Sequence, residues 1–456
     1  MRSRRLSTVF VALGAALVLG VLPALACPPT ISSTGERECV DGYVAEPSPT
    51  PGLKEAYDDG VLGAVSCSGV PMQRQSNEKC VDGMAGIFPC DDVNLASFIP
   101  LSEMDATWSN DIWGWTDPRT DKEYALIGLG NGTGFVDITR PRHPVYLGKL
   151  PTHTFSSTWR DLEVVGHHVY VVSEASGHGL QVFDLTRLRG VTEPRTWSED
   201  AHLGGFGQAH TITADPVTEV VHVNGAREGV TICAKGGGGP IMVDVSDRES
   251  PELAGCNPLD GYTHDMQCVI YQGPDTQHAG REICLGSNED TLTITDVTDK
   301  ENPEQLSRTS YATAAYVHQG WLTPNHKYFL SNDELDEVGG EVSSTTTYMW
   351  DLRDLDDPLM LGGDEHGTQS IDHQLFIKGD IATESSYMSG VRVLSTEKIR
   401  RGNSAPRASS TCTRSRTGWT SPGTWGQLPV LRLRGRCRDR HGRGTVRAAP
   451  RGEARP

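Results

Sequence analysis

An apolar segment that ends in an aspartate and a turn recurs through the middle of the chain. It reads GFVDITRPRHP at Gly134–Pro144 and IMVDVSDRESP at Ile241–Pro251, and a weaker copy ends at Ser395. Alternating apolar residues predict a β-strand, and Asp followed by Ser or Thr and Pro predicts a turn that leaves the strand. The repeated aspartates are Asp137, Asp184, Asp244, Asp296 and Asp351.

A polar pair that opens an apolar strand recurs in phase with these aspartates. Its first members are separated by steps of 50, 50, 54, 54 and 55 residues. Runs such as EYALIGL and KYFLSND, which lie between the two elements, predict middle strands. Four short strands in each unit of about 50 residues, without helical periodicity, are typical of the blades of a β-propeller. The first members of the pairs are Asn110, Arg160, His210, His264, His318 and His373.

The repeats therefore predict an all-β fold, a β-propeller that spans residues 91–398 with six readable four-stranded blades. A long array of β-sandwiches is the alternative, and the constant phase of the repeat disfavours it.

Residues 399–456 break the pattern, since 401–456 contain 13 Arg, no Lys and only two acidic residues. With permitted synonymous codons, a shifted reading frame turns Gln427–Pro450 into NYPFFDSGVVAVTGMAEGLFVLRP, which restores strand-like alternation. We interpret 399–456 as a seventh blade scrambled by frameshifts; a basic arm for an anionic partner is the alternative.

The first residues predict export. Three arginines precede an apolar run from Val9 to Leu25, and the run ends in the A-x-A sequence of a cleavage site. Residues 1–26 are therefore expected to be a signal peptide that is absent from the mature chain. Cleavage would leave Cys27 at the new N-terminus, where a lipid anchor is an alternative to secretion. No second apolar segment is long enough to predict a transmembrane span.

Acidic charge dominates outside the C-terminal segment. The sequence has 41 Lys+Arg and 59 Asp+Glu, a net charge of -18. Removing the 13 Arg and two acids of 401–456 leaves 28 basic and 57 acidic residues, a net charge of -29. Because a surface of that sign repels phosphate backbones, the sequence predicts no nucleic-acid partner.

Export also makes the cysteines candidates for disulfides. Residues 27–90 are rich in Cys, Pro and Gly, and we interpret them as a spacer pinned by disulfides. Sequence alone does not fix the pairing, but short separations favour Cys80–Cys90 and Cys268–Cys284, with Cys233 and Cys256 as further candidates. A zinc site is the alternative, although no C-x-x-C spacing supports it.

The polar pairs also define the candidate binding site. In a propeller the first strand of each blade lines the central axis, so residues in one phase converge on a ring. Imidazoles and carboxylates there could bind a divalent metal, either calcium or a transition metal, and Arg160 could instead hold an anionic ligand. Hydrogen bonds between neighbouring blades are the structural alternative. The candidates are Asn110, Asp111, Arg160, Asp161, His210, His264, Asp265, His318, Gln319, Asp372 and His373.

An acidic loop and four tryptophans are further candidates for ligand binding. The acidic loop Asn332–Glu337 could bind calcium, but it lacks the spacing of an EF-hand, so we expect a solvated run of charges. Tryptophans near the blade starts are expected to pack in the core, with a platform for stacking sugars or peptides as the alternative. They are Trp113, Trp115, Trp159 and Trp321.

Several segments resemble the choice-of-anchor B family of bacterial surface proteins, which are built from LVIVD-type repeats. The resemblance covers about residues 80–398 and is carried by NDIWGWTDP at Asn110–Pro118, YTHDMQCVIYQGPDT at Tyr262–Thr276 and HQGWLTPNHKYFLSNDELDE at His318–Glu337. It implies a secreted or surface-attached propeller whose members carry varied C-terminal anchors, and it supplies no catalytic activity to carry over to this chain.

The sequence therefore favours an exported, monomeric, non-catalytic binding or scaffold module whose partner is an extracellular ligand or a surface protein. It contains no G-x-S-x-G, H-E-x-x-H or P-loop motif. A metal-assisted hydrolase or lyase that uses the His/Asp ring is the alternative.

Overall fold

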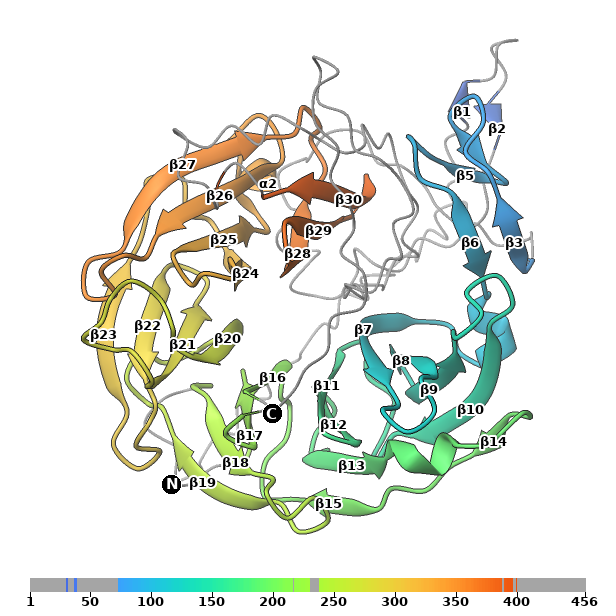
Figure 1. The fold of residues 1–456 in the computed structure, drawn as a ribbon, viewed down its shortest axis with the longest axis horizontal. Coiled ribbons are helices and arrows are strands. Elements are labelled where there is room, and N and C mark those ends of the chain that lie inside the picture. The colour runs from blue at the N-terminus through green and yellow to red at the C-terminus, as the bar shows by residue number, and fades with distance from the viewer. Residues whose placement is uncertain are drawn as a thin grey trace, which may run out of the picture.

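Six β-sheets follow one another around a ring in the computed structural model of the protein (Figure 1). The structure describes residues 73–215, 217–229, 238–387, 389–396 and 399, together with the backbone of 30–31 and 37–38. The predicted all-β propeller is confirmed. The predicted seventh blade and the signal peptide lie outside the described residues. Within the described ranges, no helix is both long enough and apolar enough to cross a membrane.

The innermost strand of each sheet is the first in the chain, and each lies beside the innermost strand of the next sheet. These strands are β7 (Ser109–Thr116), β11 (Arg160–Val165), β16 (Thr211–Asp215), β20 (Asp265–Ile270), β24 (Val317–Leu322) and β28 (Asp372–Lys378). The second strands are β8 (Glu123–Leu129), β12 (His168–Ser173), β17 (Val220–Asn224), β21 (Glu282–Ser287), β25 (Tyr328–Asp333) and β29 (Ile381–Ser386). Every polar pair predicted to open a first strand begins within one residue of such a strand.

The outer strands complete antiparallel sheets. The third strands are β9 (Gly132–Asp137), β13 (Leu180–Asp184), β18 (Ile241–Asp244), β22 (Leu292–Asp296), β26 (Thr346–Asp351) and β30 (Gly390–Ser395). The fourth strands are β10 (Val145–Pro151), β15 (Ala201–Leu203), β19 (Glu252–Cys256), β23 (Glu304–Thr309) and β27 (Leu359–Glu365). A short strand, β14 (Arg195–Thr196), adds to β10 in parallel. The described part of the sixth sheet ends at β30.

The repeated aspartates end the third strands and form the turns that leave them. In each case one carboxylate oxygen accepts a hydrogen bond from the backbone N–H two residues later, at N···O distances of 2.7 to 3.1 Å. This short-range bond fixes the chain direction after the strand, which explains why Asp recurs at this position.

The cores lie between neighbouring sheets. One apolar cluster joins Tyr170 and Val182 of the second sheet to Val223 and Val243 of the third, and similar clusters join other neighbours. Aromatic side chains also connect the first and last sheets: the ring centroids of Trp113 and Phe376 are 5.6 Å apart. Trp321 contacts the same phenylalanine at 5.0 Å, and Trp115 stacks on Tyr124 at 5.3 Å.

The segment before the ring packs on the first sheet. It contains β3 (Gln75–Glu78), which pairs with β6 (Leu95–Phe98), and the short pair β4 (Met84–Ala85) and β5 (Phe88–Pro89). The hydroxyls of Ser76 and Ser97 donate to the backbone oxygens of Arg142 (2.6 Å) and Pro141 (2.7 Å). The end of the predicted spacer is therefore docked on the turn after β9. The remaining short elements are β1 (Thr30–Ile31), β2 (Arg37–Glu38), the 3-10 helices η1 (Leu101–Met104) and η2 (Leu185–Leu188), and α2 (Asp336–Gly339).

Both disulfides expected between near neighbours are formed. Cys80 pairs with Cys90, and Cys268 of β20 pairs with Cys284, which lies directly opposite on β21 with a Cα–Cα distance of 4.1 Å. Cys256 is also disulfide-bonded. Cys233 lies outside the described residues.

Candidate functional site

Four of the predicted site residues form a row of stacked imidazoles along the axis. His210, His264, His318 and His373 come from four successive sheets. Their ring centroids are 4.4, 4.2 and 4.1 Å apart in that order. The predicted convergence of the histidines is therefore present, as a row that follows the third to the sixth sheets.

Backbone carbonyls determine which nitrogen of the central imidazoles carries the proton. His264 Nδ1 lies 3.1 Å from the backbone oxygen of His318, and His318 Nδ1 lies 2.7 Å from the backbone oxygen of His373. A carbonyl oxygen only accepts hydrogen bonds, so Nδ1 is the donor in both rings. Burial lowers the pKa of both imidazoles well below the usual value. Both rings are consequently neutral, and each Nε2 has a free lone pair.

His210, at the start of the row, follows the same rule with a carboxylate in place of the carbonyl. Its Nδ1 lies 2.7 Å from Glu174 Oε1. A donor contact from the second ring nitrogen to a carboxylate or a carbonyl is the usual arrangement of a metal-binding histidine. Among the described residues, the Nε2 atoms of His264 and His318 have no hydrogen-bond partner, and both side chains are almost fully buried.

The carboxylate that faces these lone pairs is Glu334, from the acidic loop. Its Oε2 is 3.4 Å from His318 Nε2, and its Oε1 is 3.6 Å from His373 Nε2. The hydroxyl of Tyr387 donates to the same Oε1 at 2.5 Å. Glu334 is fully buried. The sequence did not single out this residue as a ligand.

The expectation that Asn332–Glu337 is a solvated run of charges is wrong. Its charged side chains are at most 4% exposed. The Asp333 carboxylate accepts hydrogen bonds from the backbone N–H groups of Ala315 (2.9 Å) and Tyr316 (2.7 Å) and from the Tyr311 hydroxyl (2.6 Å). These bonds replace water for Asp333 and hold the loop against the ring, so the following carboxylates enter the interior.

The geometry of His264, His318 and Glu334 fits a transition-metal ion. One ligand atom from each residue lies within 4.8 Å of the others. Tetrahedral ligands at about 2.0–2.1 Å from an ion are about 3.4 Å apart, which matches the distance of 3.4 Å between His318 Nε2 and Glu334 Oε2. A neutral imidazole lone pair and a carboxylate oxygen repel each other at this separation unless a cation or a proton lies between them.

The predicted aspartates have a structural role instead. Asp111 Oδ2 accepts from the backbone N–H of Leu162 on the next innermost strand, at 3.3 Å, and Asp161 Oδ2 accepts from Ile212 in the same way, at 2.7 Å. Gln319 Oε1 makes the corresponding bond to Leu375 N, at 2.9 Å. These are the bonds between blades that the sequence left as the alternative.

Burial perturbs these carboxyl groups. It raises the pKa of Asp111 to about 6 and that of Asp265 to about 7. Gln374 Nε2 donates to Asp265 Oδ2 at 3.4 Å. Asp265 therefore lies near the axis and is directed toward the sixth sheet, whereas its neighbour His264 belongs to the histidine row.

Arg160 does not join the histidines. Its Nε donates to the backbone oxygen of Leu129 (2.9 Å), one terminal nitrogen donates to Thr152 Oγ1 (2.6 Å), and the other lies 3.0 Å from His178 Nε2. The side chain is fully buried, and burial lowers its pKa to about 9. The guanidinium thus links the first two sheets and uses its donors there, so it offers no fork for an anion at the row.

Asp372 belongs to a separate cluster. Its carboxylate lies with those of Asp336 and Glu337, and all three side chains are buried. The predicted site residues therefore do not form one ring. The four histidines lie together in a row, whereas the predicted carboxylates and Arg160 make other contacts.

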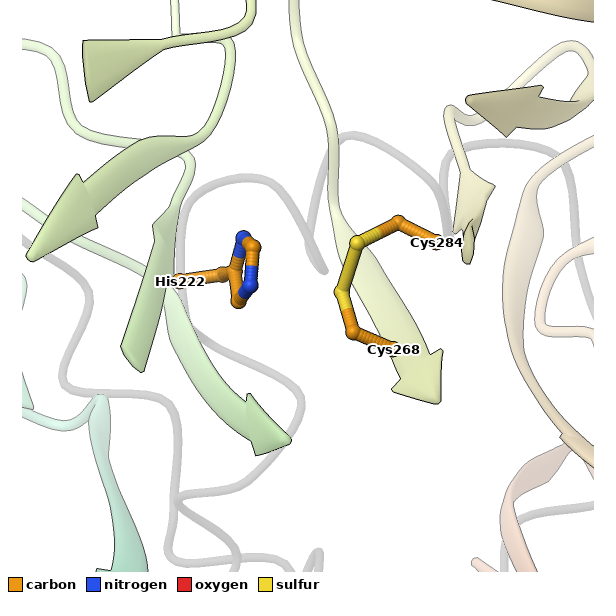
Figure 2. Close-up of side chains that lie close together, drawn as sticks. All are labelled: His222, Cys268 and Cys284. Carbon is orange, nitrogen blue, oxygen red and sulfur yellow. A yellow bond between two sulfur atoms is a disulfide. The ribbon is translucent and has the colours of Figure 1, made fainter. Parts of the chain in front are cut away.

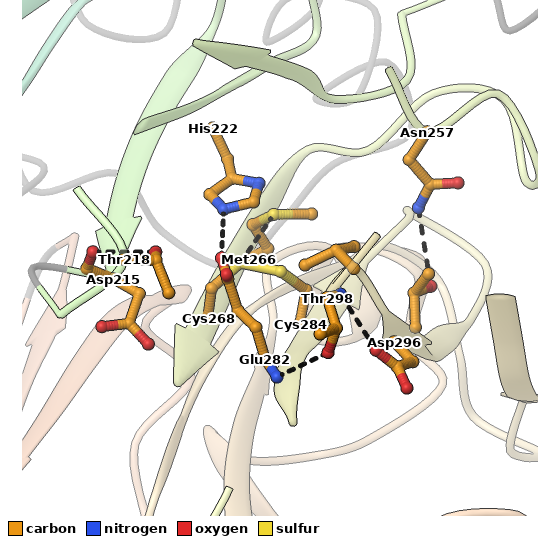
Figure 3. The surroundings of a disulfide bond; sticks show 12 residues. Asp215, Thr218, His222, Asn257, Met266, Cys268, Glu282, Cys284, Asp296 and Thr298 are labelled. Atoms are coloured by element: carbon orange, nitrogen blue, oxygen red, sulfur yellow. Dashed lines mark hydrogen bonds and ion pairs between the residues drawn. A yellow bond between two sulfur atoms is a disulfide. The ribbon is translucent and has the colours of Figure 1, made fainter. Parts of the chain in front are cut away.

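A further group of metal-binding residue types surrounds the Cys268–Cys284 disulfide. Figure 2 shows His222 of β17 facing the two sulfur atoms. His222 Nε2 lies 3.1 Å from Glu282 Oε1, as Figure 3 shows, and Lys300 Nζ donates to the other Glu282 oxygen at 2.7 Å. Because the sulfurs are bonded to each other and His222 Nε2 is paired with Glu282, this group cross-links the fourth sheet and joins it to the third, and its thiols are not available as metal ligands.

No protein-family model and no curated protein matches the chain. Among solved structures it is similar to the computationally designed Ika8 protein, with 12% identity, coverage of 64% of this chain and 71% of that one, and a TM-score of 0.40. It is also similar to a protein from Lactobacillus plantarum, with 13% identity, coverage of 62% and 77%, and a TM-score of 0.40. A third is the β-propeller domain of Cps50 (Swd1) from Myceliophteria thermophila, with 11% identity, coverage of 66% and 85%, and a TM-score of 0.40. The fold assignment rests on the sheets themselves, and the resemblance to the choice-of-anchor B family stays a prediction.

Proposed function

We propose that this protein is an exported, non-catalytic β-propeller of the choice-of-anchor B type, which binds a divalent transition-metal ion at its axis. The ligands in this proposal are His264, His318 and Glu334. The signal peptide predicted at residues 1–26 and the disulfides support export, because disulfides persist mainly in oxidising compartments. A propeller fold often serves binding or scaffold roles.

One observation carries the metal assignment: two neutral imidazoles direct unpartnered nitrogen atoms toward one buried carboxylate. Their Nδ1 atoms are already used by backbone carbonyls, so the lone pairs are fixed in place before any ion arrives. Imidazole nitrogens and a carboxylate are ligands that suit zinc and other first-row metals. Zn²⁺ is therefore the ion with which we would probe the site.

The burial of the ligands favours binding over catalysis. All three ligand side chains are at most 1% exposed. A catalytic zinc site keeps an open coordination position for water or substrate, whereas a structural site is closed by protein. The metal-assisted hydrolase that the sequence left as an alternative needs such an opening, so the geometry gives it less support.

Zinc binding is tested on the full chain, produced with its own leader and purified after export. Mass spectrometry is expected to find a mature chain that begins at Cys27. After treatment with a chelator, calorimetric titration with Zn²⁺ is expected to show one tight site per chain. His264→Gln or His318→Gln should lower the affinity by at least about 100-fold.

His153→Gln is the matched control, because His153 is exposed and paired with Glu199. It should bind Zn²⁺ like the wild type. The proposal fails if the wild type binds no stoichiometric Zn²⁺, or if both axial variants keep full affinity.

A further inference from the structure

Three buried carboxylates meet beside the acidic loop. Asp336 and Glu337 belong to α2, and Asp372 begins β28, about 35 residues later in the chain. One carboxylate oxygen from each residue lies within 4.8 Å of the others. Asp336 and Asp372 are fully buried, and Glu337 is 4% exposed.

The two aspartates are each held by one oxygen. The hydroxyl of Tyr348 donates to Asp336 Oδ2 at 2.6 Å, and the Asn332 side-chain nitrogen donates to Asp372 Oδ2 at 2.8 Å. These bonds fix the orientation of both carboxylates, and each leaves Oδ1 available.

Among the described residues, the other oxygens of the cluster have no donor apart from the neighbouring carboxyl groups themselves. Asp336 Oδ1, Asp372 Oδ1 and both oxygens of Glu337 lack a hydrogen-bond partner among the described residues. Buried polar atoms in native proteins are nearly always paired, and an unpaired buried carboxylate is especially costly. Four unsatisfied oxygens from three adjacent carboxylates therefore point to a ligand with positive charge.

We infer that Asp336, Glu337 and Asp372 form a calcium site. The ligands are all oxygen atoms, which selects a hard cation over zinc or copper. Ca²⁺ accepts carboxylates with one or both oxygens, whereas Mg²⁺ keeps several waters and is usually bound by only one or two carboxylates. Three carboxylates in a buried position therefore favour calcium.

The inference differs from the sequence-based hypothesis in its ligands. The sequence suggested calcium binding by the acidic loop alone and disfavoured it, because the loop lacks the spacing of an EF-hand. The structure supplies Asp372 from the next sheet as the third carboxylate. This site shares no ligand with the proposed zinc site.

Calcium binding is tested on the full chain after chelator treatment, with Ca²⁺ and with Tb³⁺ as a luminescent substitute. Wild type is expected to bind one Ca²⁺ per chain. Bound Tb³⁺ should emit on excitation of tyrosine, because Tyr348 contacts Asp336, and added Ca²⁺ should quench that emission. Glu337→Gln and Asp372→Asn should each weaken Ca²⁺ binding at least tenfold.

Glu341→Gln provides the control, since Glu341 lies nearby but is exposed. It should bind Ca²⁺ like the wild type, and circular dichroism checks that every variant is folded. Failure of folded wild type to bind Ca²⁺ or Tb³⁺ would overturn the inference, whatever the variants do. His264→Gln separates the two proposals, because it should lose Zn²⁺ binding and keep Ca²⁺ binding.

Discussion

In both halves of the ring, the first residue of the polar pair links its innermost strand to the next one, but only in the second half does it keep an unpaired nitrogen. In the first sheet it holds Asn110, whose Oδ1 accepts a hydrogen bond from the backbone N–H of Arg160 at 2.6 Å. In the fourth and fifth sheets it holds His264 and His318, whose Nδ1 atoms donate to the backbone of the next sheet. All three side chains therefore link one innermost strand to the next.

The difference lies in what remains after that link is made. An imidazole has two nitrogens on different sides of one ring, so it can bond the next sheet with Nδ1 and direct Nε2 toward Glu334. Arg160, in the second sheet, directs its guanidinium between the first two sheets and uses its donors there. A polar residue in phase thus becomes a candidate ligand only when its structural bond leaves an atom unpaired.

The largest effect is expected from removing Arg160, the residue with the most complete structural role. Arg160→Leu leaves three acceptors without this donor, two of which are buried, and each buried loss costs about 1–3 kcal/mol, so we expect a destabilisation of about 4 kcal/mol. Urea unfolding measures it. Zinc stoichiometry should be unchanged.

Arg119→Leu is the control for this substitution, because Arg119 is exposed; it should change stability by no more than about 0.5 kcal/mol. A folded Arg160→Leu protein with weakened Zn²⁺ binding would contradict the division between the two halves, since it would connect Arg160 with the histidines.

A smaller effect is expected at the Cys268–Cys284 disulfide, where residues of metal-binding types are already paired. Replacing both cysteines by Ala removes a cross-link between residues 16 positions apart, which should cost about 3 kcal/mol. Thermal unfolding measures the loss. The number of Zn²⁺ ions bound should stay the same, because neither sulfur is a ligand.

The paired variant Cys80→Ala/Cys90→Ala removes a disulfide that precedes the ring and serves as the comparison. It should also leave Zn²⁺ binding unchanged. Loss of a bound Zn²⁺ ion in the first double variant alone would show that the group around His222 binds metal.

The repeat made most of the fold predictable, because its signals are local. The aspartate at the end of a third strand accepts a hydrogen bond from the backbone N–H two residues later, so Asp137 and its equivalents predict the turns from sequence alone. The constant phase likewise placed the first strands to within one residue. Short separation was sufficient to suggest the pairs Cys80–Cys90 and Cys268–Cys284.

The site was less predictable because it depends on contacts between distant segments. Glu334 follows a strand, where alternation no longer tells which side chains turn inward, and its burial depends on the bonds that Asp333 makes. The direction of Arg160 is decided by acceptors on other strands, which no spacing reveals. Phase therefore identified the histidines but not the carboxylate that faces them.

The smallest predicted effect concerns the buried carboxyls in the first half of the ring. Burial, together with the charges of Asp111 and Asp265, raises the pKa of Asp161 well above its usual value. The folded state then binds this proton more readily than the unfolded chain, so stability is lost as the pH rises from the unfolded pKa of about 3.9 through the folded pKa. Asp161→Asn should reduce the loss of stability that the wild type shows as the pH rises. Asn still accepts the Ile212 N–H, so the link between blades is kept.

Asp117→Asn tests the sign of this argument. The guanidinium of Arg189 lowers the pKa of Asp117, so its stabilising contribution is complete above about pH 4, near the unfolded pKa, and is lost only below it. Asp117→Asn should therefore destabilise the protein equally at pH 5 and pH 8. Asp161→Asn should instead raise the stability relative to the wild type more at pH 8 than at pH 5, because it removes a buried carboxylate that is ionised at the higher pH. Equal effects of Asp161→Asn at both pH values in urea unfolding would mean that this carboxyl does not titrate between them. The buried aspartates would then contribute only their hydrogen bonds, and the contrast between the two halves of the ring would rest on the histidines alone.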